Sequence, residues 1–226
     1  MTEPSFVVHA SRRSSGLPNR RYEYRIWPRQ THPAVSYLQR TWRLVAAEHR
    51  NDIYLIPTTR NPALVKLRNG QQLEIKRRIR DVGTIQLWTM PVSTGFPLAN
   101  AHRAQLAQAL ALSGGFNVEA GQSPAHLLAA LPARAPALVS QMVRKSRLIF
   151  RRGNCRAEIC RVAVDSWTGL SIALESTDLS SVAIAMDDLQ FGQLRNRSYG
   201  EVLGLLCGLH PAGSRLPIQF QPHERR

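Results

Sequence analysis

The sequence predicts an α+β protein, built on a mostly antiparallel β-sheet or β-barrel with helices at its side. Three observations lead to this class. Many short segments alternate apolar and polar residues at the strand period of two, turn residues join several of them as hairpins, and a few segments between them have apolar residues at helical spacing. At 226 residues the chain can bury a full core, and a single domain is the default.

The chain is expected to open with a strand followed by a helix. Tyr22 to Trp27 is rich in aromatic residues and ends at Pro28, as a strand would. Thr31 can cap a helix with a proline in its first turn, and apolar positions at helical spacing continue as far as Val45. A second strand is predicted at residues 51–56, followed by a loop.

The stretch from Leu64 to Ile79 is the strongest strand signal in the chain. Apolar and cationic residues alternate on both sides of Asn69-Gly70, which favours a tight hairpin turn over residues 69–72. Such a hairpin places four cations on one side, where they repel one another unless water or an anion lies among them. They are Lys66, Arg68, Lys76 and Arg78. This face is therefore either solvated or anion-binding.

Beyond the hairpin the sequence predicts one more strand, then helices, three further strands and a last helix. Strands are predicted at residues 85–90, 145–150, 157–164 and 170–175. Helices are predicted at residues 100–112, ended by Gly114-Gly115, and in short pieces between Ser123 and about Met142, which Pro132 and Pro136 interrupt. Ser198 and Glu201 form a capping box for a last helix that runs to about Cys207.

Both ends of the chain differ in composition from the middle. Residues 1–20 are basic and contain little to pack, which predicts a flexible basic arm, and residues 210–226 predict a loose basic tail. The folded domain is then expected to span residues 21–209.

The charge balance indicates an anionic partner. The chain has 30 Lys plus Arg against 15 Asp plus Glu, a formal net charge of +15. A nucleic acid, a nucleotide, polyphosphate and an anionic membrane surface all suit such a charge. Arginine greatly outnumbers lysine, which favours forked recognition of phosphate oxygens.

Sparse cysteines and the absence of a long apolar segment predict a cytoplasmic protein that does not enter a membrane. Cys155, Cys160 and Cys207 are too few for a disulfide framework, and the first two would face opposite sides of a strand, which makes them poor partners for one metal ion. The start of the chain lacks a signal-peptide core, and the longest apolar run, Val202 to Leu209, is too short to span a bilayer.

Several common functional motifs are missing from the sequence. It contains neither type of glycine-rich phosphate loop, no serine nucleophile elbow, no pair of histidines four residues apart, and no aromatic residues in the RNA-recognition arrangement. If phosphate is bound, side chains must bind it.

A series of short motifs between Arg21 and Leu206 resembles the CYTH superfamily, the triphosphate tunnel proteins that include class IV adenylyl cyclases, thiamine triphosphatases and inorganic triphosphatases. The motifs occur in the family's order. They are Asp52-x-Tyr54, Lys66-x-Arg68, Leu73-x-Ile75-Lys76, Arg144-Lys145-x-Arg147, Glu158, Glu175 and Asn196-x-Ser198-Tyr199.

The resemblance implies an antiparallel β-barrel, or tunnel, with a polar, basic interior and flanking helices. Basic side chains would bind a triphosphate, and acidic ones would bind Mg²⁺ or Mn²⁺. The implied phosphate-binding residues are Arg25, Lys66, Arg68, Lys76, Arg78, Lys145 and Arg147. The implied metal ligands are Glu23, Glu158 and Glu175, and Lys76 and Glu158 would have catalytic roles.

Three family carboxylates are replaced in this chain. Arg21, Cys160 and Ala173 stand where the family has acidic residues, whereas the basic positions are kept. A hard divalent ion needs several oxygen ligands, so the remaining glutamates could bind one metal ion but hardly two.

Three functional hypotheses follow from the sequence. The first is a metal-dependent phosphohydrolase, or triphosphatase, acting on a triphosphate-bearing small molecule or polyphosphate. The second is a non-catalytic sensor or adaptor that binds nucleotide, polyphosphate or RNA in the tunnel or on a basic outer face. The third is a basic β-sandwich scaffold unrelated to the tunnel proteins. The sequence indicates neither the substrate nor the oligomeric state.

Overall fold

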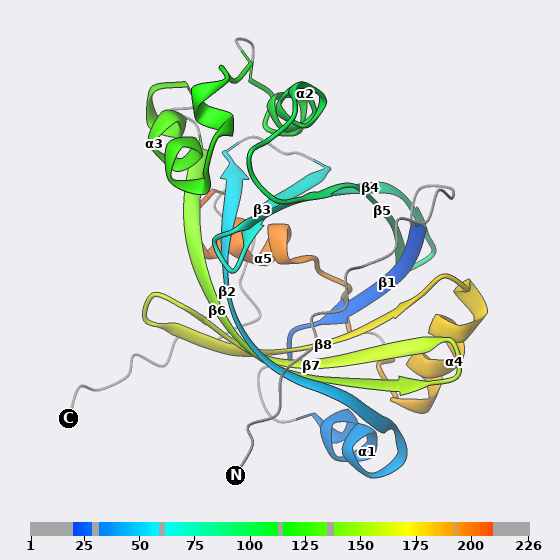
Figure 1. Ribbon diagram of the computed structural model, residues 1–226. Helices are drawn as coiled ribbons and strands as arrows, with labels where there is room; N and C mark the ends of the chain where they lie inside the picture. The colour runs from blue at the N-terminus through cyan, green and yellow to red at the C-terminus, as the bar shows by residue number, and fades with distance from the viewer. Residues whose placement is uncertain are drawn as a thin grey trace, which may run out of the picture.

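Eight strands form one closed, fully antiparallel barrel (Figure 1). The computed structural model describes residues 20–28, 32–58, 62–112, 115–134, 138–192 and 194–209. The strand order is β1-β5-β4-β3-β2-β6-β7-β8, and β8 pairs with β1 to close the barrel. The predicted α+β class is confirmed, and the β-sandwich alternative is wrong. The strands are β1 Arg20–Ile26, β2 Arg43–Pro57, β3 Ala63–Arg68, β4 Gln72–Val82, β5 Ile85–Thr94, β6 Leu138–Arg152, β7 Cys155–Val164 and β8 Trp167–Ser176.

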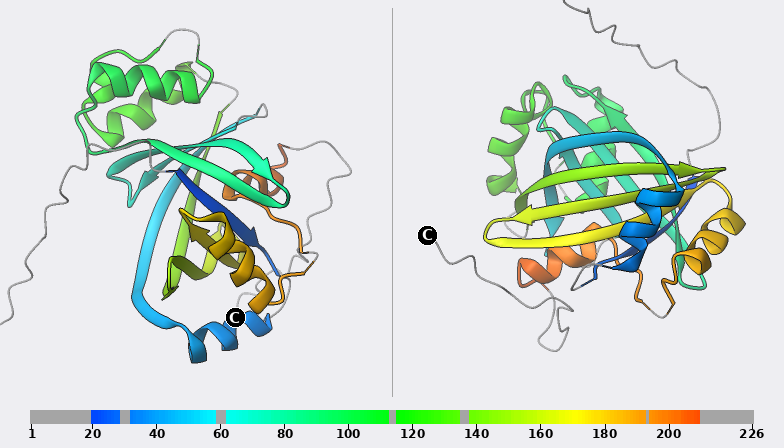
Figure 2. Two further views of the ribbon diagram at one scale, coloured as in Figure 1. Left: turned by 90° about the vertical axis from the view of Figure 1, so that its right-hand side faces the viewer. Right: turned by 90° about the horizontal axis from the view of Figure 1, so that it is seen from below.

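Five α-helices surround the barrel in the described residues. In Figures 1 and 2, α2 and α3 lie together over β3 and β4, whereas α1 and α4 lie on the opposite side of the barrel, near β7 and β8. In the view of Figure 1, α5 appears inside the ring of strands, and its residues pack on an apolar cluster with β2, β6, β7 and β8. The helices are α1 Pro33–Thr41, α2 Asn100–Ala109, α3 Pro124–Arg134, α4 Leu179–Asp188 and α5 Tyr199–Leu206, with a short 3₁₀ helix at Glu119–Gly121.

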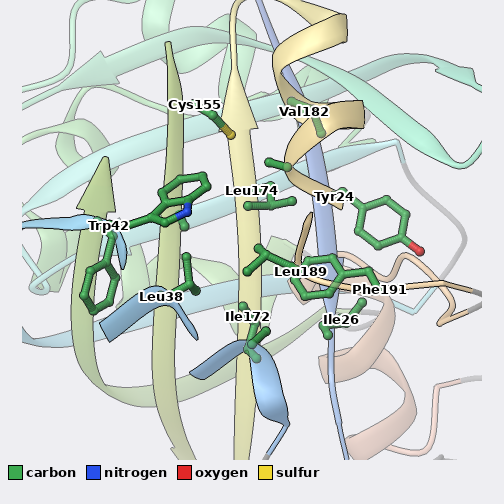
Figure 3. Close-up of a cluster of buried hydrophobic side chains, with 14 of the residues drawn as sticks. Tyr24, Ile26, Leu38, Trp42, Cys155, Ile172, Leu174, Val182, Leu189 and Phe191 are labelled. Atoms are coloured by element: carbon green, nitrogen blue, oxygen red, sulfur yellow. The ribbon is translucent and has the colours of Figure 1, made fainter. Parts of the chain in front are cut away.

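The apolar faces of the strands point outward and pack under the helices. On one side, residues of β1, β7 and β8 pack against α1, α4 and the segment after α4 (Figure 3). In this cluster Tyr24 and Phe191 stack with ring centroids 5.9 Å apart. On the other side, outward residues of β2 to β5 such as Leu67 and Leu73 pack against Leu106 of α2 and Leu127 of α3. The side chains that face the interior are thus free to be polar.

A third apolar cluster closes one end of the barrel interior. It joins Trp27, which follows β1, and inward-facing residues of β2, β6, β7 and β8, among them Trp167, to Tyr199, Val202 and Leu203 of α5. The capping box predicted at Ser198 and Glu201 is present and starts this helix. The lumen is therefore blocked at the α5 end.

The predicted hairpin is confirmed as β3 and β4. Asn69 and Gly70 both have positive φ, 51° and 65°, which the tight turn requires and which these two residue types tolerate. Lys66 is 7% exposed, so this face of the hairpin is not the solvated surface that one alternative expected.

Two long strands were misjudged from the sequence. The first helix was predicted to continue to Val45, but α1 ends at Thr41, and β2 begins at Arg43. Helical pieces were predicted as far as Met142, but β6 begins at Leu138. The cause is the same in both cases. β2 and β6 pair along their whole length, from Arg43 opposite Arg151 to Pro57 opposite Leu138, and this ladder overrides the local spacing of apolar residues.

Other differences concern helices and the chain ends. The helix α4 was not predicted, and α3 continues through Pro132, which was expected to interrupt it. The predicted cap Thr31 lies outside the described residues, and His32 caps α1 instead. Of the predicted arm only its last residue, Arg20, is described, as the first residue of β1, and the predicted tail lies outside the described residues.

The three cysteines are free thiols. Cys155 belongs to the outer cluster under α4, whereas Cys160 belongs to the cluster at the α5 end of the lumen. The two therefore lie on opposite faces of β7.

Truncation of Phe191 should destabilise the fold strongly. Phe191 is 0% exposed and packs on both Tyr24 and His32, so Phe191→Ala leaves a cavity and should lower the free energy of unfolding by about 3–5 kcal/mol. Urea unfolding measures the change. Ile184→Ala on α4, where the side chain is 60% exposed, is the control and should change it by less than about 0.5 kcal/mol. Similar effects of the two substitutions would contradict the packing described.

Candidate anion-binding site

The barrel lumen contains a charged cavity that opens into a larger mouth. The cavity has a volume of ≈ 120 Å³, and the mouth, at the end opposite α5, one of ≈ 560 Å³. Basic residues outnumber acidic ones in the cavity wall by eight to four. The basic residues are Arg25, Arg50, Lys66, Arg68, Lys76, Lys145, Arg147 and Arg156, and the acidic residues are Glu23, Glu74, Glu158 and Glu175.

Arg25 of β1 is at the centre of one ion-pair network. Its guanidinium contacts Glu23 at 3.3 Å and Glu158 of β7 at 3.1 Å, and Nη1 donates a hydrogen bond to Ser171 Oγ at 3.0 Å. Lys76 Nζ donates to the other oxygen of Glu23 at 2.7 Å, and Arg147 Nε donates to the other oxygen of Glu158 at 2.9 Å. Both carboxylates are thus paired through both oxygens.

The ion pairs keep these carboxylates ionised despite their burial. Burial opposes ionisation of Glu23, but Lys76 and Arg25 outweigh it and lower its pKa to about 2. Burial likewise opposes ionisation of Glu158, and Arg25 and Arg147 hold its pKa well below the ordinary value.

Asp52 of β2 is the centre of a second network on the opposite wall. Asp52 is 0% exposed and accepts hydrogen bonds from Lys66 Nζ at 3.2 Å and Lys145 Nζ at 2.9 Å, while Arg50 lies 3.5 Å away. Burial opposes its ionisation, but Lys145 and Lys66 hold the pKa of Asp52 well below its ordinary value. Its other oxygen, Oδ1, is buried and has no hydrogen-bond partner among the described residues.

Two stacked tyrosines form the floor of the cavity beside Lys145. The rings of Tyr54 and Tyr199 lie 5.5 Å apart, and Lys145 Nζ lies 3.9 Å from the centroid of the Tyr199 ring. Lys145 also donates to Tyr54 Oη at 2.6 Å. The aromatic faces and Asp52 together stabilise an ammonium group that water does not reach.

Glu74 of β4 pairs with the hairpin cations. It lies directly opposite Lys66 in the β3–β4 ladder, with its carboxylate 3.0 Å from Lys66 Nζ and 3.0 Å from Arg68 Nε.

Four arginines surround the passage between the cavity and the mouth, because they belong to the walls of both. We refer to this set, Arg50, Arg68, Arg147 and Arg156, as the neck. Arg151 adds a fifth arginine to the mouth, where Glu48 is the single acidic residue of the wall. An anion that approaches the cavity meets this positive charge first.

Six of the seven predicted phosphate-binding residues line the cavity. They are Arg25, Lys66, Arg68, Lys76, Lys145 and Arg147. Arg78 is not part of the cavity wall. It lies opposite Trp88 in the sheet, but its guanidinium pairs with Asp81 through Nε at 2.7 Å, next to a register shift in β4. The binding roles of all seven remain predictions.

The residues predicted to bind a metal ion do not fit one. Glu23, Glu158 and Glu175 all line the cavity, but the first two are paired with Arg25, Lys76 and Arg147 as described. Glu175 lies 3.1 Å from Arg21 and 3.9 Å from Arg156. A divalent cation would have to displace basic groups from all three carboxylates, and the described residues contain no cluster of three or more His, Cys, Asp or Glu suited to a metal ion.

Sequence reasoning missed five charged residues of the cavity and the mouth: Arg50, Glu74, Arg156, Glu48 and Arg151. The period of two could have found the first three. Arg50 precedes Asp52 by two residues, Arg156 precedes Glu158 by two, and Glu74 precedes Lys76 by two, so each shares a strand face with a residue that was singled out.

The fold and the lumen define a closed antiparallel barrel with a charged interior that is open at one end. This is the architecture that the sequence resemblance implied. No protein-family model and no curated protein matches the chain.

Solved structures do match it. The PH1012 protein from Pyrococcus horikoshii OT3 is 13% identical, with a TM-score of 0.51, and the match covers 80% of this chain and 98% of that one. HpAC1 from Hippeastrum, described as a putative adenylyl cyclase with a dominant triphosphatase activity, is 10% identical with a TM-score of 0.48, covering 88% of this chain and 97% of that one. The Pct1 RNA triphosphatase from Schizosaccharomyces pombe is 10% identical with a TM-score of 0.33, covering 79% and 78%.

The likeness to PH1012 shows a shared fold. The closed antiparallel barrel that the sequence resemblance implied is therefore confirmed as a fold. No helix in the described ranges has the length and apolar character needed to cross a bilayer.

Lys145 should make stability depend on pH above neutrality. Burial and the neighbouring Lys66 lower the pKa of Lys145 to about 7, against the opposing effect of Asp52. Between pH 7 and 10 the unfolded chain therefore binds more protons than the native one, and the free energy of unfolding should rise with pH by up to about 1.4 kcal/mol per unit.

Lys145→Met removes this contribution. Urea unfolding at pH 7, 8, 9 and 10 should show that the wild type gains stability relative to the variant as the pH rises. Parallel curves for the two proteins would contradict a depressed pKa at Lys145.

Proposed function

We propose that this protein binds triphosphate- or polyphosphate-type anions in the cavity and neck of its barrel. The observation that carries the proposal is the wall of the cavity, in which eight basic side chains face four acidic ones inside an enclosed lumen. Cations gathered in a partly dehydrated space repel one another, and a polyanion relieves that repulsion.

The neck favours phosphate over other anions. Its four residues are all arginines, and guanidinium groups match phosphate oxygens with two parallel hydrogen bonds. Arg156 has the weakest internal pairing of the four, at 3.9 Å from Glu175, so it has donors available to a ligand.

The mouth favours a phosphate chain over a nucleotide base. Proteins that bind single-stranded nucleic acid combine a basic groove with aromatic side chains on which bases stack. The described residues that line the mouth are charged, polar or aliphatic, such as Val45 and Ile149, and include no aromatic ring apart from the imidazole of His49. Base recognition therefore has little support at the entrance.

The ion-paired carboxylates favour binding over hydrolysis. A metal-dependent triphosphatase would need Glu23, Glu158 and Glu175 free to bind Mg²⁺ or Mn²⁺, whereas each lies beside basic groups. A sensor or adaptor that binds the anion without cleaving it needs no such carboxylates. We therefore favour the non-catalytic role and keep a triphosphatase as the alternative, to be separated by experiment.

Calorimetry with tripolyphosphate tests the proposal. In buffer with EDTA the wild type should bind tripolyphosphate, and Arg156→Gln should weaken binding roughly tenfold or more, because a hydrogen bond to a charged group contributes about 1.5–3 kcal/mol. The matched control is Arg161→Gln, the same change on the exposed outer face of the same strand, which should leave the affinity almost unaltered.

Two outcomes would count against this function. No binding of tripolyphosphate at millimolar concentration would reject the anion site. Release of phosphate in the presence of Mn²⁺, lost in Glu158→Gln, would instead establish the triphosphatase.

A further inference from the structure

Glu74 is a buried acidic residue in a place that an anion would need. It lies on the lumen face of β4, is 2% exposed, and belongs to the wall of the cavity. Its two oxygens lie 3.0 Å from Lys66 Nζ and 3.0 Å from Arg68 Nε, two of the cations that a bound phosphate would contact.

The contacts of the Glu74 carboxylate with Lys66 and Arg68 are ionic contacts without hydrogen bonds. Glu74 Oε2 and Arg68 Nε are both buried, and neither has a hydrogen-bond partner among the described residues, so these short contacts lack hydrogen-bond geometry. The carboxylates of Glu23 and Glu158, by contrast, accept hydrogen bonds at 2.7 Å from Lys76 and at 2.9 Å from Arg147. Glu74 is thus desolvated like the other two but less well satisfied.

Asp52 leaves Lys66 with a counter-ion if the Glu74 carboxylate moves away. Lys66 Nζ donates a hydrogen bond to Asp52 at 3.2 Å, and Asp52 lies behind the wall of the cavity, where an entering anion does not reach it. Lys66 therefore keeps one counter-ion when its second partner moves away. Of the two carboxylates that contact Lys66, Asp52 is therefore the permanent partner and Glu74 the replaceable one.

We propose that Glu74 occupies the place of a phosphoryl group between Lys66 and Arg68, and that it sets the affinity of the cavity by competing with the ligand for these two cations. This inference rests on the proposed function. An entering phosphoryl group presents several oxygens to Arg68 and Lys66, and the Glu74 carboxylate turns away from the like charge.

Competition of this kind selects for highly charged anions. A singly charged anion offers Lys66 and Arg68 no more than the glutamate already does, whereas the end of a phosphate chain brings more charge and more acceptor oxygens. Tripolyphosphate then displaces the Glu74 carboxylate from these two cations, whereas anions of lower charge do not.

Glu74→Gln tests the proposal with the full-length protein. Calorimetry should show tripolyphosphate binding about tenfold or more tighter than in the wild type, and orthophosphate should gain by at least as large a factor. Arg68→Gln should remove most of that gain when it is combined with Glu74→Gln, because Arg68 is one of the cations for which the glutamate competes. Thermal melting of each variant establishes that it is folded.

Two matched variants separate competition from a general change in charge. Glu119→Gln alters the same functional group at an exposed site outside the barrel and should leave the affinity unchanged. Glu48→Gln removes an acidic group at the mouth, where its carboxylate pairs with Arg147 at 2.7 Å, and should produce a smaller gain than Glu74→Gln.

The results distinguish this inference from the proposed function. If the wild type binds tripolyphosphate and Glu74→Gln binds it equally or more weakly, or if Glu48→Gln gains as much, the competition is overturned and the anion site stands. If neither the wild type nor Glu74→Gln binds at millimolar tripolyphosphate, the anion site itself is rejected.

Discussion

The contact between Arg25 and its two glutamates is the interaction on which the charged interior depends. A buried charge is costly unless it is paired and hydrogen-bonded, and this guanidinium satisfies groups from three strands at once: Glu23 on β1, Glu158 on β7 and Ser171 on β8. These strands are neighbours around the closure of the barrel, where β8 returns to β1. The network therefore links the first strand of the chain to two of the last from within the lumen.

A polar lumen is possible because the apolar surface is buried elsewhere. The strands put their hydrophobic residues on the outside, and two separate helical layers cover them, α1 with α4 on one side and α2 with α3 on the other. An ordinary barrel of eight strands fills its interior with side chains from every strand. Here the side chains that face the interior form ion pairs around a cavity, and an apolar cluster closes the end occupied by α5.

The sequence was most informative where local signals and the barrel agree. The hairpin of β3 and β4 was predicted near its turn, because Asn69-Gly70 favours the turn and the alternation of residues fixes the register there, but the register shifts around Arg78 in β4 were not. The starts of β2 at Arg43 and of β6 at Leu138 could not be predicted in this way, because the strand conformation there comes from pairing partners about a hundred residues away in the chain.

The site was predicted in part for a similar reason. Alternation and the family motifs identified six of the eight basic residues of the cavity wall, but not which anions meet them. The pairing of Lys66 with both Asp52 and Glu74, and of Glu158 with Arg25 and Arg147, depends on distances across the closed lumen. Such distances follow from the order of strands around the barrel, which the motifs do not encode.

The position of α5 has a consequence for the shape of molecule that this barrel can accept. A passage open at both ends could let a long chain thread through it, whereas a blind one admits a terminus and stops it against the aromatic floor of Tyr54 and Tyr199. A linear molecule would then be recognised by its terminal group, whereas a cyclic molecule or the middle of a linear one would not enter the lumen. A blind lumen of this kind suits the end of a linear molecule, whatever the length of the rest of that molecule.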